Sequence, residues 1–316
     1  MLVTGASGFV GQALCAELVR RGCAVRGVVR SHAAIAASIM SVSVISEISA
    51  DTNWSAAFDG VEVVIHLAAR VHVMNDIASD PLSEFRRVNT AGTEHLARCA
   101  AGNGVRRLVY VSSIKVNGEE TRDGQRFSET DAPAPQDPYG VSKWEAEQAL
   151  HRVAKETGLE VVIVRPTLVY GPGMKGNFAQ MLNVVGRGIP LPFASLQNQR
   201  SLIYLGNLVD ALITCATHPS AINQTYLVCD GEDVSTPYLL RQLASAMDVP
   251  SRLFPCPPAL LRWAGKLTGK SQQLERLLGS LRVDGDKIRR ELNWVPPYSL
   301  QQGLQATAGW YRGLRS

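Results

Sequence analysis

The chain has 316 residues, of which 46% are hydrophobic and 19% are charged, a composition typical of a soluble enzyme with a large core. At this length two lobes are expected rather than one. The formal net charge of +4 is scattered along the chain without an arginine-rich block, which argues against a nucleic-acid partner and suits a small anionic substrate.

The six cysteines show neither a CxxC pair nor the spacing of metal ligands, so we expect free thiols in a reducing cytoplasm and no metal site. No apolar stretch is long enough to span a bilayer, and we expect no membrane partner. The chain starts directly on an expected strand, which leaves no room for a signal peptide. The sequence therefore predicts a cytoplasmic protein.

The first eleven residues combine a short apolar run with Gly5, Gly8 and Gly11, and an amphipathic helix follows them. In this order of strand, turn and helix, Gly5 permits the tight turn and Gly8 lets the backbone approach a phosphate. Gly11 lets the helix pack closely on the strand, and the free amides of the first helical turn face the anion. The pattern predicts that a dinucleotide pyrophosphate binds here.

Up to about residue 170 the hydrophobic pattern alternates between strands and helices. Apolar runs predict strands at 2–4, 24–29, 61–67, 107–112 and 160–165, and amphipathic patterns predict helices at 11–21, 81–101 and 139–157. Nearly continuous apolar strands are typical of a parallel sheet that is buried on both faces. The predicted fold class is therefore α/β, with a doubly wound parallel sheet of the Rossmann type.

Tyr139 and Lys143 stand four residues apart at the start of an expected helix, which puts both on one helix face. Because positive charge favours a nearby phenolate, we expect Lys143, together with the positive nicotinamide of an oxidised cofactor, to lower the pKa of Tyr139. Ser112 and Ser113 end the preceding strand, at the edge where open α/β sheets bind ligands. These residues predict an acid/base site beside the dinucleotide, although the spacing alone would also fit a solvated helix face.

Beyond residue 166 the sequence changes in texture. Residues 171–200 are rich in glycine, proline and asparagine, residues 231–316 resemble short helices, and a strand at 225–230 returns to the sheet. We expect a dinucleotide-binding domain at 1–170, rejoined by about 201–230, and a smaller substrate-binding lobe formed by 171–200 and 231–316. A helix around 260–281, with Arg262, Lys266 and Lys270 on its polar face, is compatible with a membrane surface, but we expect a lid over the cofactor lobe.

The motifs together resemble those of the extended short-chain dehydrogenases/reductases, in the NAD-dependent epimerase/dehydratase family that acts on nucleotide sugars. The resemblance covers nearly the whole chain and rests on Gly5-x-x-Gly8-x-x-Gly11, His66-Leu-Ala-Ala69, Val88-Asn-Thr-Ala-Gly-Thr93, Val111-Ser-Ser113, Tyr139-x-x-x-Lys143, Arg165-Pro166 and Tyr170-Gly-Pro172. It implies a catalytic triad in which Tyr139 is the acid/base at the sugar 4-hydroxyl, Ser113 hydrogen-bonds that oxygen and Lys143 tunes both.

The resemblance also implies which residues hold the ligands. The implied cofactor-binding residues are Gly5, Ser7, Gly8, Phe9, Val10, Gly11, Arg30, Asp51, Thr52, Leu67, Ala68, Ala69, Asn89, Tyr139, Lys143 and Pro166. The implied substrate-binding residues are Ser113, Asn177, Arg200 and Arg276, the last of which needs a gap in the register. A guanidinium binds phosphate oxygens in bidentate fashion, which suits a nucleotide diphosphate, whereas each arginine taken alone also fits a surface charge.

Three positions depart from the family pattern. Dehydratases of the family carry Asp-Glu where this chain has Ile114-Lys115, so we expect no dehydration. Arg30 ends the second strand, where an acid usually meets a free ribose 2′-hydroxyl, so NADP(H) is favoured, with NAD(H) as the alternative. Asn117 replaces a tyrosine and is expected to alter how the sugar ring is seated.

Within the family, the stretches 111–118, 175–178 and 276–281 are most similar to bacterial O-antigen enzymes that reduce a UDP-4-keto-6-deoxy-N-acetylhexosamine. We therefore expect an NAD(P)-dependent 4-reductase that forms UDP-N-acetylquinovosamine or UDP-N-acetylfucosamine for surface polysaccharide. The alternative is a UDP-hexose or UDP-N-acetylhexosamine 4-epimerase that retains NAD. A third reading, a non-catalytic dinucleotide sensor, has no need for the intact triad.

Family members usually pair through their long helices, here 81–101 and 139–157. The resemblance therefore implies a homodimer, in which Ala91, Ala97, Ala146 and Ala149 would allow close approach. The same helices could equally cover the sheet in a monomer.

Overall fold

The computed structural model describes residues 1–31, 41–71, 80–267 and 271–314. Its main element is a seven-stranded sheet in the order β3-β2-β1-β4-β5-β6-β9, in which all neighbouring strands are parallel. The strands are β1 (Leu2–Thr4), β2 (Arg26–Val29), β3 (Ser41–Val44), β4 (Val63–His66), β5 (Arg107–Val111), β6 (Glu160–Pro166) and β9 (Thr225–Val228). The predicted parallel sheet is confirmed, and β3 is a strand that the sequence analysis did not predict.

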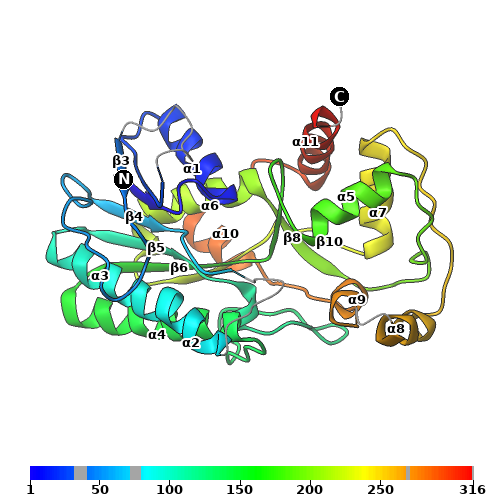
Figure 1. Cartoon of the computed structure of the whole chain (residues 1–316), viewed down its shortest axis with the longest axis horizontal. Coiled ribbons are helices and arrows are strands. Elements are labelled where there is room, and N and C mark those ends of the chain that lie inside the picture. Colours follow the sequence, from blue (N-terminus) through cyan, green and yellow to red (C-terminus); the bar gives the residue numbers. More distant parts are fainter. Residues whose placement is uncertain (32–40, 72–79, 268–270, 315–316) are drawn as a thin grey trace.

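Helices cover both faces of this sheet (Figure 1). One face carries α1 (Phe9–Arg20), α6 (Leu205–Thr217) and α10 (Asp286–Leu292), and the other carries α2 (Pro81–Phe85), the π-helical turn η2 (Arg86–Ala91), α3 (Gly92–Gly102) and α4 (Pro138–Thr157). A separate cluster of buried apolar side chains fills each interface between helices and sheet, as burial of both sheet faces requires. This doubly wound arrangement confirms the predicted fold class.

A smaller lobe lies beside the large sheet (Figure 1). Its three-stranded sheet has the order β10-β8-β7, formed by β7 (Leu168–Tyr170), β8 (Arg200–Tyr204) and β10 (Asp233–Val234). The helices α5 (Asn177–Gly186), α7 (Thr236–Ala246) and α11 (Leu300–Gly313) pack around a third apolar cluster. Adjacent residues of β8 face different clusters, Leu202 the third and Ile203 the first, so β8 forms the boundary between the lobes.

Three segments differ from the sequence expectation. β8 pairs with β7 and β10 and not with the large sheet, whereas α6 and β9 of the same expected stretch rejoin the large sheet and its core. Residues of α10 and Trp294, expected in the smaller lobe, are buried against the large sheet. The helix predicted around 260–281 is two helices, α8 (Pro258–Leu267) and α9 (Ser271–Leu278), and Lys270 lies outside the described residues. Across the described ranges, no helix is long and apolar enough to cross a membrane.

The small residues proposed for a helix-to-helix dimer contact are mostly buried inside the chain. Ala97, Ala146 and Ala149 have no exposed surface, because α3 and α4 pack on the sheet through this side. The expectation that these three alanines face a partner is therefore wrong.

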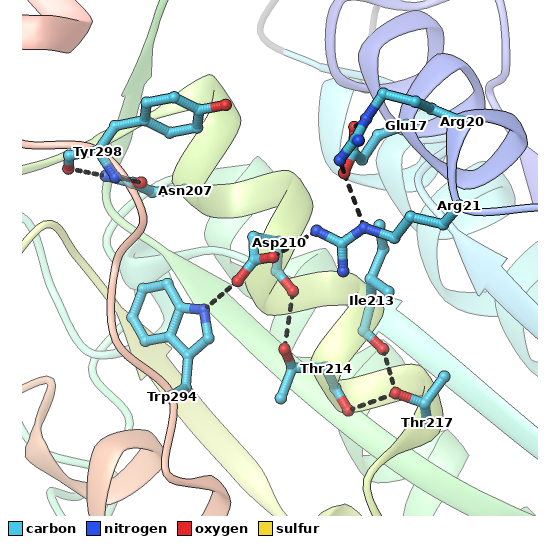
Figure 2. A network of polar contacts seen from close by, with 10 residues as sticks. All are labelled: Glu17, Arg20, Arg21, Asn207, Asp210, Ile213, Thr214, Thr217, Trp294 and Tyr298. Atoms are coloured by element: carbon cyan, nitrogen blue, oxygen red, sulfur yellow. Dashed lines mark hydrogen bonds and ion pairs between the residues drawn. The ribbon is translucent and has the colours of Figure 1, made fainter.

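A polar contact joins three helical segments on one side of the sheet (Figure 2). Asp210 on α6 accepts hydrogen bonds from Arg21 Nη2 at 2.5 Å and from Trp294 Nε1 at 2.9 Å. Arg21 ends α1 and also donates to Glu17 at 2.7 Å, while Trp294 follows α10 and is buried. One carboxylate thus ties the end of α1 to the segment after α10.

We expect Asp210→Ala to lower the free energy of unfolding by about 1–3 kcal/mol, because the buried Trp294 N–H loses its acceptor. Urea denaturation measures the change. Arg20→Ala is the matched control, since Arg20 is exposed and pairs with Glu17 alone in the described structure, and exposed ion pairs contribute little. Equal effects of the two substitutions would contradict the prediction.

Candidate active site

The glycine turn brings the backbone of α1 against the end of β1. Gly5 has a φ of +70°, and the amide of Gly8 donates to the carbonyl of Gly5 at 2.9 Å. A Cβ on Gly11 would lie 2.1 Å from the Gly5 oxygen, closer than any side chain permits. The N-cap residue Gly8 provides no side-chain cap for α1, so the amides of its first turn remain available for an anion. The close packing predicted for Gly11 is confirmed.

The turn is supported from behind by a buried histidine. His66 Nδ1 hydrogen-bonds Thr4 Oγ1 at 2.6 Å, and His66 Nε2 hydrogen-bonds Thr93 Oγ1 at 3.0 Å. The amide of Ala68 donates to Thr4 Oγ1 at 3.2 Å, which ties the segment after β4 to the end of β1. Burial, with a smaller contribution from Lys143, lowers the pKa of His66 to about 3. His66 is therefore a neutral structural residue beneath the site.

The three predicted catalytic residues line one cavity of about 700 Å³. Ser113 follows β5, and Tyr139 is the second residue of α4, whose N-cap Asp137 accepts the amide of Gly140 at 2.7 Å. Lys143 lies one helical turn after Tyr139, and its Nζ donates to the carbonyl of Val111 at 2.8 Å. The strand end and the helix start thus bring Ser113, Tyr139 and Lys143 together, as the sequence predicts.

Burial dominates the electrostatics of the triad. It lowers the pKa of Lys143 to about 7, against the charge of Glu147, which favours the ammonium. Burial also raises the pKa of Tyr139, the charge of Asp137 raises it further, and the Ser113 hydroxyl opposes both. Without a cofactor, the chain's own groups therefore hold Tyr139 as a protonated phenol, and the lowering of its pKa expected from Lys143 together with an oxidised nicotinamide stays a prediction.

The residues implied as cofactor ligands fall into two groups. Six of them line the cavity, namely Val10, Leu67, Ala69, Tyr139, Lys143 and Pro166. Ten lie outside its lining, namely Gly5, Ser7, Gly8, Phe9, Gly11, Arg30, Asp51, Thr52, Ala68 and Asn89. Asn89 is buried, and its amide hydrogen-bonds the backbone of Arg70 and donates to Ser142 Oγ at 3.0 Å. In this structure Asn89 fixes the segment after β4 to α4.

The residues expected near the adenosine end are found at the surface around β2 and β3. Arg30 is exposed at the end of β2, and Asp51 is exposed in a turn. Thr52 Oγ1 donates to the carbonyl of Glu47 at 3.0 Å, and the carbonyl of Thr52 accepts from His95 at 2.9 Å. The contacts of Thr52 order the turn. The cofactor contacts predicted for Arg30 and for Asp51 and Thr52 stay predictions.

Besides Ser113, the three other predicted substrate residues come from three separate elements, and all of them line the cavity. Asn177 begins α5, Arg200 begins β8 and Arg276 lies on α9. Arg200 Nη1 donates to the carbonyls of Arg276 at 2.6 Å and Gly279 at 3.1 Å. Arg276 Nε and Nη2 are buried without a hydrogen-bond partner in the described part of the chain, and Glu119 lies 3.8 Å from Nε. Both guanidiniums therefore suit a bound anion.

The positions that depart from the family pattern have distinct surroundings. Ile114 is buried, while Lys115 Nζ pairs with Glu119 at 2.8 Å and with Asp137. The sequence analysis did not predict this ion-pair network beside the cavity. Within the described ranges, no three His, Cys, Asp or Glu side chains are placed to hold a metal. Asn117 is buried and lies outside the cavity lining, so an effect on how the sugar ring is seated would be indirect and stays a prediction.

The cavity is lined in part by α9 and the residues after it. Arg276 and Leu277 lie on α9 and Leu281 follows it, and the lid over the cofactor lobe stays a prediction. The remaining wall is largely apolar and includes Phe178, Met181, Val184, Leu191 and Phe193. The sequence signal for this wall is the helical spacing of apolar residues in α5, which the sequence analysis did not connect with the site.

Comparisons with known proteins agree with this geometry. A family model described as NAD dependent epimerase/dehydratase matches residues 1–229. A Vibrio cholerae protein named UDP-glucose 4-epimerase is 47% identical over 310 residues, which cover 98% of this chain and 94% of that protein. An Escherichia coli O157:H7 protein named N-acetyl-alpha-D-glucosaminyl-diphospho-ditrans,octacis-undecaprenol 4-epimerase is 26% identical, with coverage of 97% and 93%.

A solved structure shares the fold at lower identity. The UDP-glucose 4-epimerase of Thermus thermophilus, in complex with NAD, superposes with a TM-score of 0.79 at 23% identity and covers 99% of this chain and 98% of that chain. The family model spans more than half of the chain, and the Vibrio cholerae relative is similar along nearly all of it. The protein is an enzyme of the NAD-dependent epimerase/dehydratase family, within the extended short-chain dehydrogenases/reductases.

Proposed function

We propose that the protein is a UDP-hexose or UDP-N-acetylhexosamine 4-epimerase that retains NAD. The observation that carries this proposal is that Ser113, Tyr139 and Lys143 line the same cavity as Arg200 and Arg276. The 47% identity with a UDP-glucose 4-epimerase of Vibrio cholerae favours inversion at C4 over the net reduction expected from the sequence.

The turn between β1 and α1 fits a dinucleotide. The exposed Gly8 and the uncapped start of α1 offer backbone amides to a pyrophosphate. A Cβ on Gly5 would lie 3.0 Å from the amide nitrogen of Ala68, so the glycine permits the tight cradle. Val10, Leu67 and nearby cavity residues would then flank the nicotinamide end.

The glycine turn, Val10 and Leu67 would hold NAD, which would supply reversible hydride transfer at C4 of the sugar. As the phenolate, a form that the Lys143 ammonium and the positive charge of bound NAD would favour, Tyr139 would take the proton of the 4-hydroxyl as the C4 carbonyl forms, and would give it back when C4 is reduced. Ser113 donates a hydrogen bond to the C4 oxygen, and Lys143 stabilises the transient phenolate. Arg200 and Arg276 hold the diphosphate, while Asn177 contacts the substrate from the start of α5.

A second candidate is the NADP(H)-dependent reduction of a UDP-4-keto-6-deoxy-N-acetylhexosamine in surface polysaccharide synthesis. Arg30 favours it, because its exposed guanidinium at the end of β2 suits a 2′-phosphate. Ile114 is a buried apolar side chain and Lys115 is an ion-paired ammonium. Neither can act as the acid or base of a dehydration, which supports the absence of dehydration for the epimerase and for the reductase. The free cysteines support a cytoplasmic location.

We also propose that the protein is a homodimer that pairs through its long helices. The outer faces of α3 and α4 carry the ion pair of Arg98 with Glu156, so a dimer here would meet through polar side chains. Sedimentation equilibrium at micromolar concentration is expected to give the mass of two chains. The mass of one chain would reject the dimer.

We expect the purified protein to carry stoichiometric NAD without any addition, and to interconvert C4 epimers of UDP-glucose or UDP-N-acetylglucosamine. Nucleotide released on denaturation and product NMR measure the two properties. NADPH oxidation at 340 nm with the 4-keto-6-deoxy sugar, in protein without bound NAD, would establish the reductase instead.

Tyr139→Phe is the control for this assay. It should reduce turnover by at least about 10²-fold, because the acid/base group is lost, while the NAD content stays unchanged. Full activity in this variant would exclude Tyr139 from proton transfer.

We expect Gly11→Ala to abolish NAD retention, because its Cβ would lie 2.1 Å from the Gly5 oxygen and must displace the turn or α1. NAD content after purification measures the effect. Gly102→Ala is the matched control, since a Cβ there meets no atom within 4 Å. Normal NAD content in Gly11→Ala would contradict the assigned binding turn.

A further inference from the structure

One face of α4 carries three functional groups at successive turns. Tyr139, Lys143 and Glu147 are spaced four residues apart, so they lie along the same side of the helix. Lys143 is 2% exposed and Glu147 is 0% exposed. The mechanism described above assigns no role to Glu147, although burying a carboxylate is costly unless it is paired.

The Glu147 carboxylate is held as an acceptor by two side chains. Arg165 on β6 donates to it through Nε at 2.9 Å and through Nη2 at 2.5 Å. Ser112 donates its hydroxyl at 2.5 Å. Because the carboxylate accepts all three hydrogen bonds and donates none of them, these contacts fit its ionised form.

The same network reaches the loop after the catalytic serine. Arg165 Nη1 donates to Asn117 Oδ1 at 2.9 Å, and Asn117 Nδ2 donates to the carbonyl of Ser128 at 2.9 Å. This contact explains the buried asparagine at a position that departs from the family pattern. We define Ser112, Asn117, Glu147 and Arg165 as the buried carboxylate network, which joins β5, the loop after it, α4 and β6.

We propose that Glu147 is a positioning residue for the epimerase reaction, acting through Lys143. Its fixed carboxylate favours the ammonium form of Lys143, and its hydrogen bond to Ser112 holds the strand end that carries Ser113. This inference rests on the proposed function for its catalytic consequence, but the effect on Lys143 is a property of the protein itself.

The groups around Lys143 make the sign of this effect clear. Tyr139 and Glu147 face Lys143 from the same helix, α4. Tyr110 on β5 lies beneath it, with Lys143 Nζ 4.4 Å from the ring centroid, and the neutral His66 interacts with it from β4. Burial favours neutral lysine, whereas the charge of Glu147 raises the pKa of Lys143. Arg165, on β6, neutralises part of that charge.

Removing the charge of Glu147 therefore has a defined direction. The pKa of Lys143 falls, so the ammonium is lost at a lower pH, and stabilisation of the Tyr139 phenolate is lost with it. The alkaline limb of the turnover profile should move to lower pH by about one unit, as expected for one charge at close range in a protein interior.

The test compares Glu147→Gln with Glu147→Asp and Glu145→Gln. Glu145→Gln removes a carboxylate from the same helix at an exposed ion pair with Arg86, and Glu147→Asp keeps the charge. The pH dependence of turnover for C4 inversion is measured for each. We expect the limb to shift in Glu147→Gln alone; an unshifted limb, or the same shift in Glu145→Gln, overturns the proposal.

A second readout needs no substrate. Protein labelled with ¹³C at lysine Cε is titrated by NMR as purified, with Lys143→Met to assign the signal. We expect a lower pKa of Lys143 in Glu147→Gln than in the unsubstituted protein, and an equal pKa overturns the proposal. If no sugar is epimerised, the proposed function fails while this titration still decides the role of Glu147.

A substitution that leaves Arg165 unpaired can unfold the protein, since an isolated buried charge is strongly destabilising. In that case the double substitution Glu147→Gln with Arg165→Gln removes both charges together. The NMR titration is expected to show the same direction of shift, because Glu147 is the charge that acts on Lys143. An unchanged pKa in the double variant overturns the proposal.

Discussion

The contact between the start of α1 and the turn after β1 is the constraint from which the cofactor site follows. Because a Cβ on Gly11 would lie 2.1 Å from the Gly5 oxygen, only glycine lets the helix begin this close to the strand. The N-cap residue Gly8 leaves the amides of the first turn of α1 without a side-chain cap. His66 and Thr4 then fix β4 to β1 at 2.6 Å, so the adjoining segment forms the opposite wall.

The catalytic side depends on a second constraint, the burial of charged groups along α4. Lys143 Nζ donates to the carbonyl of Val111, yet desolvation lowers the pKa of Lys143 to about 7. The site is therefore poised between ammonium and amine near neutral pH, where a nearby charge has a large influence. Glu147, itself compensated by Arg165, supplies that charge from the next turn of the same helix.

Local sequence patterns predicted the strands correctly where the hydrophobic pattern of a single element reflects its own burial. The central strands β1, β4, β5 and β6 are mostly apolar and buried, which is what burial on both faces requires. β3 was missed because its Ser-Val-Ser-Val alternation describes a half-exposed edge strand and is only four residues long. Asn89, implied as a cofactor ligand by resemblance, and Asn117, noted as a departure from the family pattern, are both buried and hydrogen-bonded to distant side chains. Nothing in the adjacent sequence reveals their distant partners.

The sequence by itself determined the fold class, the glycine turn and the pairing of Tyr139 with Lys143, because these follow from periodicity and from spacing within single elements. Only the tertiary structure decided which residues share the cavity. Arg200 donates to the carbonyl of Arg276, 76 positions further along the chain. Arg165 on β6 donates to Glu147 on α4. It also decided that burial raises the pKa of Tyr139, since desolvation depends on everything packed around a group and not on the spacing within the motif.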